Sequence, residues 1–147
     1  MVLLIVGCCA IAACELDMTV AIDGKNPPTF YLSGSGNLDF FIVSEVAPKN
    51  QKQASAQRDS DKDIVLWEIW PSNISYEDRR IWKLPEIKYG EVPAGFVQKF
   101  PANSEPPSLV EGKVYAAGGP ASNANGGSVW FTIRNGKSVE VPKPGGY

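Results

Sequence analysis

Apolar and polar side chains alternate along much of this chain with a period of two residues. In the first clear case, from residue 16 to residue 22, every second side chain is apolar: Leu16, Met18, Val20 and Ile22. Successive side chains of a β-strand point to opposite faces, so this alternation predicts a half-buried strand. The turn-forming pair Asp23-Gly24 ends it.

Other runs rich in β-branched and aromatic residues predict strands at residues 29–33, 38–46, 64–70, 87–89, 96–100, 113–116 and 128–141. In the run 38–46, we expect the face formed by Leu38, Phe40 and Ile42 to point inward. The opposite face of that run carries Asp39 and Glu45.

Glycine- and proline-rich turns separate these short runs, and almost no segment has a helical period. This pattern is typical of a sandwich or a barrel. We therefore predict an all-β chain that forms a single antiparallel β-sandwich with an extra C-terminal hairpin. The pair Asn135-Gly136 favours a type I′ turn at the tip of that hairpin. A single helical turn is expected where Ser75 and Asp78 have the spacing of a capping box.

The composition narrows the chemistry that this domain can perform. The 147 residues include 14 Lys or Arg, 16 Asp or Glu and no histidine, for a net charge of −2. That charge gives no basic surface of the kind that binds nucleic acid, so no nucleic-acid partner is expected. Without histidine, the chain lacks Ser-His-Asp and Cys-His catalysis and imidazole metal ligands. We expect no catalytic residues, no metal and no cofactor.

Acidic residues leave two alternatives open. Asp59, Asp61 and Asp63 alternate as at the start of a calcium loop, but Ile64 stands where such a loop needs glycine. A solvated loop over residues 47–62 is favoured over a weak calcium site. A pair of carboxylates is also sufficient for glycan hydrolysis, so a carboxylate-based envelope hydrolase is the enzymatic alternative.

The segment Leu109-Val110-Glu111-Gly112-Lys113-Val114-Tyr115 carries a family resemblance. The spacing of Leu109, Gly112 and Tyr115 resembles the E–F corner of immunoglobulin-like and fibronectin type III domains, although Glu111 departs from the latter pattern. In those domains the tyrosine hydroxyl bonds back to the corner backbone. The resemblance implies an Ig-like sandwich with an F strand from residue 113, an F–G loop at 117–127 and a G strand at 128–134.

The N-terminal residues 1–14 contain no charged side chain and end in the last of three cysteines. The run is too short to cross a bilayer but suits an export signal. Ile11-Ala12-Ala13-Cys14 resembles the bacterial lipobox, although no Lys or Arg precedes the apolar run. The resemblance implies a signal peptide at 1–13, removed in the mature protein, and a domain at 14–147 acylated, with palmitate for example, at Cys14. Ordinary secretion after cleavage at Ala12, and an apolar N-terminal strand or helix, are the alternatives.

A lipobox implies a protein of the bacterial cell envelope. Glu15 rather than Asp follows Cys14, which favours the outer membrane over the inner membrane. Because the first strand pattern begins at Leu16, the tether is short, and we expect the N-terminal strand edge to face the membrane.

Exposed aromatic residues are the best candidates for a binding surface. Trp67 and Trp70 are an odd number of residues apart, so one regular strand directs them to opposite faces, and we expect Trp70 to be the exposed one. Trp70, together with Asn123 and Asn125 of the Gly/Asn loop, forms the predicted binding surface. The sequence thus favours a non-catalytic envelope lipoprotein that binds or scaffolds an envelope protein or glycan. An inhibitor or immunity lipoprotein is a further alternative.

Overall fold

The computed structural model describes residues 17–47, 63–84 and 86–145. In these residues the chain is all-β, apart from two short 3₁₀ turns, η1 (Glu77–Arg79) and η2 (Ile81–Lys83). The strands are β1 (Thr19–Ile22), β2 (Thr29–Ser33), β3 (Asn37–Leu38), β4 (Phe41–Glu45), β5 (Ile64–Pro71), β6 (Ile87–Lys88), β7 (Phe96–Phe100), β8 (Val114–Gly119), β9 (Ala121–Ser122), β10 (Gly127–Arg134) and β11 (Lys137–Glu140).

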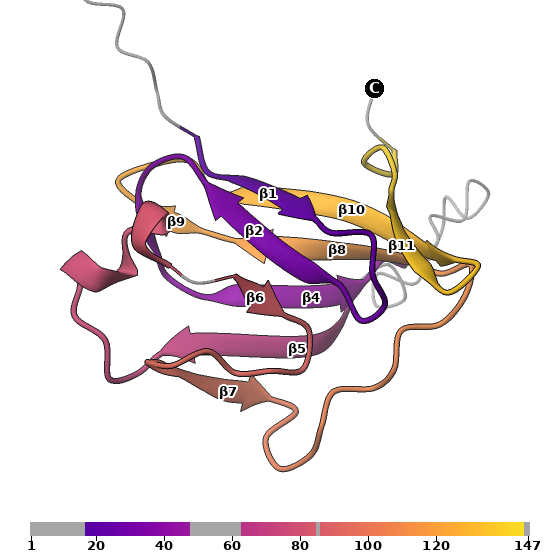
Figure 1. Cartoon of the computed structure of the whole chain (residues 1–147), viewed down its shortest axis with the longest axis horizontal. Helices are drawn as coiled ribbons and strands as arrows, with labels where there is room; N and C mark the ends of the chain where they lie inside the picture. Colours follow the sequence, from indigo (N-terminus) through magenta and orange to yellow (C-terminus); the bar gives the residue numbers. More distant parts are fainter. Residues whose placement is uncertain (1–16, 48–62, 85, 146–147) are drawn as a thin grey trace, which may run out of the picture.

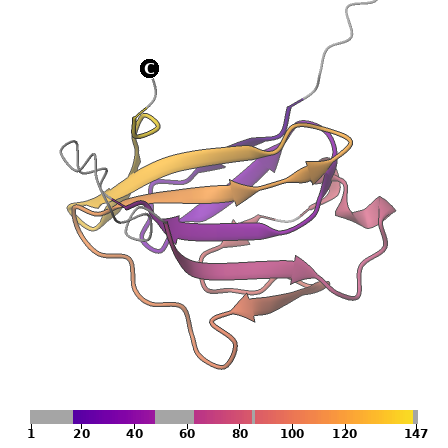
Figure 2. The same cartoon turned by 180° about the vertical axis from the view of Figure 1, so that it is seen from behind.

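Two antiparallel sheets face each other in a sandwich, as Figures 1 and 2 show. The smaller sheet has the order β1-β2-β6, and the larger one has the order β11-β10-β8-β4-β5-β7. The short pair β3-β9 joins the two at one end of the molecule. The predicted all-β antiparallel sandwich is confirmed.

Aromatic side chains from both sheets fill the space between them. Phe30 of the smaller sheet lies with its ring centre 5.1 Å from that of Phe41 and 5.9 Å from that of Phe131, both of the larger sheet. Trp67 meets Tyr89 edge to face at 5.6 Å. Such pairs each contribute about 0.5–1.5 kcal/mol beyond the burial of their area, so these rings hold the sheets together.

The predicted inward orientation of the run 38–46 is confirmed for Leu38, which is fully buried, and wrong for Phe40 and Ile42. Phe41 and Val43 are fully buried, whereas Phe40 and Ile42 lie on the outer side of the larger sheet. The reason is a change of pairing partner. Leu38 pairs with β9, and from Phe41 onward the chain pairs with β5, so Leu38 and Phe41 both point inward although they are an odd number of residues apart.

The predicted corner contact at Tyr115 is present. The backbone N–H of Val110 donates a hydrogen bond to the Tyr115 hydroxyl oxygen at 2.7 Å, and Leu109 and Tyr115 are buried. Gly112 adopts a φ of +77°, a left-handed conformation that favours glycine. The corner thereby fixes the path of the chain into β8.

The C-terminal hairpin also forms as predicted. Asn135 and Gly136 have φ angles of +51° and +69°, as a type I′ turn requires. The Glu111 carboxylate accepts a hydrogen bond from the Asn135 backbone N–H at 2.6 Å, which ties the hairpin tip to the corner segment.

Several predictions concern residues outside those that the structure describes. The signal sequence, Cys14 and the acidic residues Asp59 and Asp61 are among them. In the described ranges, no helix has the length and apolar character needed to cross a membrane.

Candidate binding face

The outer face of the six-stranded sheet carries a group of apolar side chains near one end of the sandwich. Trp70 and Phe40 stack there, with ring centres 5.2 Å apart and planes inclined by only 10°. The sequence-based prediction for the two tryptophans of β5 is confirmed, because Trp67 is fully buried and Trp70 is 40% exposed.

The edge strand β7 extends this group. Val97 pairs with Trp70, and Phe100 pairs with Glu68, which itself pairs with Ile42 of β4. Directly paired residues project from the same face of a sheet. Val97 and Phe100 are 37% and 46% exposed. We call the set Phe40, Ile42, Trp70, Val97 and Phe100 the outer apolar face.

One carboxylate lies among these apolar side chains. Glu68 is partly buried, and its Oε1 accepts a hydrogen bond from the indole N–H of Trp70. This bond fixes the indole against Phe40 and leaves the second carboxylate oxygen without a partner among the described side chains. A partially desolvated carboxylate interacts more strongly with a cation than a fully hydrated one does.

A groove of about 340 Å³ continues from Ile42 across the same side of the sheet. The groove is hollowed over β8, because Ala116 has a small side chain and Gly118 has none. Trp130 of β10 lines the groove, and the Lys143 ammonium lies 5.4 Å from the centre of the Trp130 ring. The outer side of this sheet is therefore both apolar and hollowed.

The side-chain amides of Asn123 and Asn125 each have a hydrogen-bond partner within the domain. The Asn123 side-chain amide donates to the Tyr76 hydroxyl at 2.8 Å, and the Asn125 amide donates to a carboxylate oxygen of Asp17 at 2.7 Å. Both amides hold segments of the domain together. The grouping of these two residues with Trp70 as one binding surface stays a prediction.

The glycines around this loop are required by close backbone contacts. A Cβ on Gly119 would lie 2.0 Å from the Phe40 carbonyl oxygen, and one on Gly127 would lie 2.2 Å from the Met18 carbonyl oxygen. The implied F–G loop at 117–127 is also shorter than expected, since β8 runs to Gly119 and β9 follows directly. This region closes the end of the sandwich.

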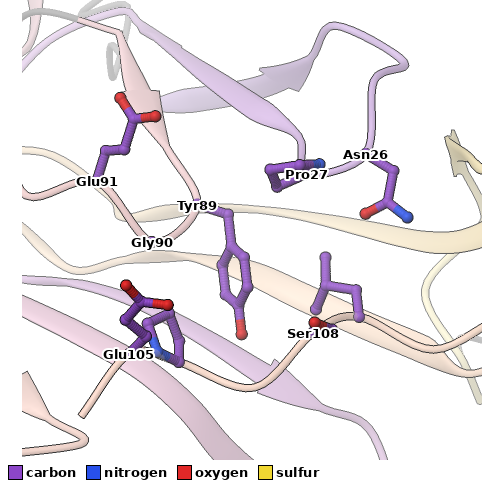
Figure 3. Close-up of a pocket in the computed structure, with 9 residues that line it drawn as sticks. Asn26, Pro27, Tyr89, Gly90, Glu91, Glu105 and Ser108 are labelled. Carbon is purple, nitrogen blue, oxygen red and sulfur yellow. The ribbon is translucent and has the colours of Figure 1, made fainter.

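A second cavity of about 470 Å³ lies beside the turn between β1 and β2 (Figure 3). Glu91 and Glu105 both line it, and Tyr89 projects into it from the turn after β6. The Tyr89 hydroxyl donates to the Pro107 carbonyl oxygen at 2.8 Å. Burial, with a smaller contribution from Tyr115, raises the pKa of the Tyr89 phenol well above its usual value.

The two carboxylates of this cavity are not directed at one point in the structure. Glu91 bonds to the Lys88 ammonium, and in Figure 3 its carboxylate points away from Glu105. A carboxylate-pair hydrolase needs both groups directed at one bond of the substrate. Within the described ranges, no group of three or more cysteine or acidic side chains is placed to hold a metal ion.

Sequence reasoning missed Phe40, Ile42, Val97 and Phe100 as members of the outer face. A register shift between Glu68 and Ile69 pairs Gln98 with Ile69 and Phe100 with Glu68. This bulge places Val97 and Phe100 on one face although they are an odd number of residues apart. No local signal in the sequence marks that shift.

No protein-family model, curated protein or solved structure matches this chain.

Proposed function

We propose that this chain is a lipid-anchored bacterial envelope protein whose β-sandwich holds a protein partner through the outer apolar face. The observation that carries the binding proposal is the Phe40–Trp70 stack, continued to the sheet edge by Val97 and Phe100. Contiguous exposed apolar side chains on a soluble domain mark interaction sites more often than isolated ones do.

A protein partner suits this face better than a glycan. Sugar rings stack on an open aromatic face, and here Phe40 occupies one face of the Trp70 indole. The aliphatic Ile42 and Val97 favour apolar side chains of a partner, and Trp is the residue type most enriched at interface hot spots. Glu68 favours a partner that places a Lys or Arg near the centre of the contact.

The anchor proposal rests on Ile11-Ala12-Ala13-Cys14 at the end of the uncharged N-terminal run. Cys14 precedes Asp17, the first described residue, by three positions. Three residues span at most about 10 Å, so acyl chains on Cys14 would hold the sandwich against the membrane.

Metabolic labelling tests the anchor. Bacteria that express C-terminally tagged wild type or Cys14→Ser receive radioactive palmitate, and their membranes are separated on a density gradient. We expect label on the wild type alone, and wild type in the outer-membrane fraction. Equal labelling and identical fractionation of the two proteins would contradict the anchor.

Cross-linking in intact envelopes tests the binding face. Tagged wild type, Trp70→Ala and Tyr31→Ala are cross-linked and purified under denaturing conditions. Tyr31 is a matched control because it is 44% exposed but belongs to β2 in the other sheet. We expect one polypeptide to be captured by wild type and Tyr31→Ala and lost with Trp70→Ala. Equal capture by all three would place the partner elsewhere on the molecule.

A further inference from the structure

The segment that joins the two sheets at one end of the sandwich carries two exposed aromatic side chains. It leaves β5 of the larger sheet, forms η1 and η2, and enters β6 of the smaller sheet. Trp82 in this segment is 66% exposed, the highest value for a large apolar side chain in the described part of the chain, and Tyr76 is 45% exposed.

Basic groups accompany both rings. The Arg79 guanidinium lies 5.0 Å from the centre of the Tyr76 ring, and the Lys83 ammonium lies 5.4 Å from that of Trp82. Arg79, Arg80 and Lys83 are balanced by Glu77, Asp78 and Glu86, so the segment carries no net charge. Arg80 pairs with Glu77, and the Lys83 ammonium lies 3.1 Å from a carboxylate oxygen of Asp78.

Hydrogen bonds tie the described part of this segment to itself and to the sandwich. The Ser75 hydroxyl accepts from the Asp78 backbone N–H at 3.2 Å and donates to its carboxylate at 2.7 Å, the capping contact that the sequence predicts. Behind Trp82, the side chain of Ile81 is buried, and its backbone N–H donates to the Gly36 carbonyl oxygen at 3.0 Å. Trp82 is thus presented outward by a fixed backbone.

The same end of the sandwich receives the N-terminal strand. The Met18 backbone N–H donates to the Asn125 carbonyl oxygen at 3.0 Å, and the Asn125 amide bonds to Asp17. Two residues before Asn125, Asn123 bonds to the Tyr76 hydroxyl. Figures 1 and 2 both place the start of β1 and the two 3₁₀ turns at this end.

We infer that Trp82 and Tyr76, with Arg79 and Lys83, form a second contact with the phospholipid surface beside the anchor. Indole and phenol rings prefer the interface between headgroups and acyl chains, and Arg79 beside Tyr76 can meet a headgroup phosphate. This inference rests on the proposed anchoring at Cys14, because the short tether brings this end of the domain to the bilayer.

Fluorescence quenching by brominated lipids tests the contact on the full acylated chain. Wild type, Trp82→Phe and Trp130→Phe are reconstituted into phosphatidylglycerol–phosphatidylcholine vesicles whose acyl chains carry bromine near the headgroup. Trp130 is the matched control, because it lies on the outer side of the larger sheet, in the groove beside Lys143. We expect quenching in wild type and Trp130→Phe, and loss of most of it in Trp82→Phe.

The outcomes separate the two proposals. If acylated wild type floats with the vesicles but is not quenched, or if Trp82→Phe is quenched as strongly as wild type, the lipid contact is wrong and the anchor stands. If the wild type carries no acyl chain and does not float, the anchor itself fails and the contact loses its basis.

Discussion

The indole of Trp70 stacks on the phenyl ring of Phe40, although Phe40 belongs to the two-residue link between β3 and β4. A Glu68 oxygen accepts a hydrogen bond from the indole N–H. Trp70 is therefore fixed in position while remaining 40% exposed. A rigid, exposed aromatic side chain binds a partner with little loss of conformational freedom.

The two tryptophans of β5 are predicted to differ in their effect on stability. Trp67 is fully buried and donates its indole N–H to Gln98 at 2.8 Å, so Trp67→Ala should lower the free energy of unfolding by about 3–5 kcal/mol. Trp70→Ala should lower it by about 1 kcal/mol, the value of one exposed aromatic stack. Urea denaturation of both variants measures the difference. A larger loss for Trp70→Ala would show that Trp70 is a structural rather than a binding residue.

Gly127→Ala is predicted to loosen the junction between β1 and β10. The new Cβ would lie 2.2 Å from the Met18 carbonyl oxygen, a clash with backbone that should cost about 3 kcal/mol or more. Gly112→Ala is the control, since its Cβ meets nothing within 4 Å and its φ of +77° costs about 1–2 kcal/mol. Hydrogen exchange at the Met18 amide should accelerate in Gly127→Ala alone. Equal rates in the two variants would contradict the clash.

Tyr115→Phe is predicted to weaken the corner. It removes the hydroxyl oxygen that accepts from the partly buried Val110 N–H, and a hydrogen bond of this kind contributes about 0.5–1.5 kcal/mol. Tyr31→Phe changes an exposed side chain of the other sheet and should alter stability by about 0.5 kcal/mol or less. Chemical denaturation compares the two. A neutral Tyr115→Phe would mean that the corner does not depend on its hydroxyl.

Asp23 is predicted to make stability depend on acid pH. Partial burial raises the pKa of its carboxyl group, but hydrogen bonds from the backbone N–H groups of Thr29 and Lys25 outweigh this and hold the pKa below 3.8. A lowered pKa in the folded state gives stability that is present above the unfolded pKa of about 3.9 and is lost as pH falls through the folded value.

Unfolding free energies between pH 7 and pH 2 measure this contribution. Wild type should lose stability more steeply than Asp23→Asn as the pH falls below about 4. Superimposable pH profiles for the two proteins would exclude a role for the Asp23 carboxylate.

Local patterns predicted those parts of the fold that local contacts determine. The alternation before Asp23, the type I′ turn at Asn135-Gly136 and the corner at Tyr115 each depend on residues close in sequence. The change of partner between Leu38 and Phe41 depends instead on β9 and β5, which lie far along the chain. Alternation counted through that break therefore assigned Phe40 to the wrong face.

The candidate site was predictable only in part, for the same reason. The odd spacing of Trp67 and Trp70 was sufficient to find Trp70. Asn123 was predicted to be free to bind a ligand, because its hydrogen-bond partner, Tyr76, is 47 positions away in the sequence. Phe100 was missed because a bulge brings it to the outer face. Long-range pairing decided each of these cases.

Site-specific photo-cross-linking in living cells tests the binding face most directly. A benzophenone amino acid replaces Val97 on the outer apolar face or, as control, Tyr31 on the other sheet. If the outer face holds a protein partner, illumination should yield one discrete cross-linked product from position 97 and none from position 31. No product from position 97, or the same product from both positions, would contradict the proposed binding face.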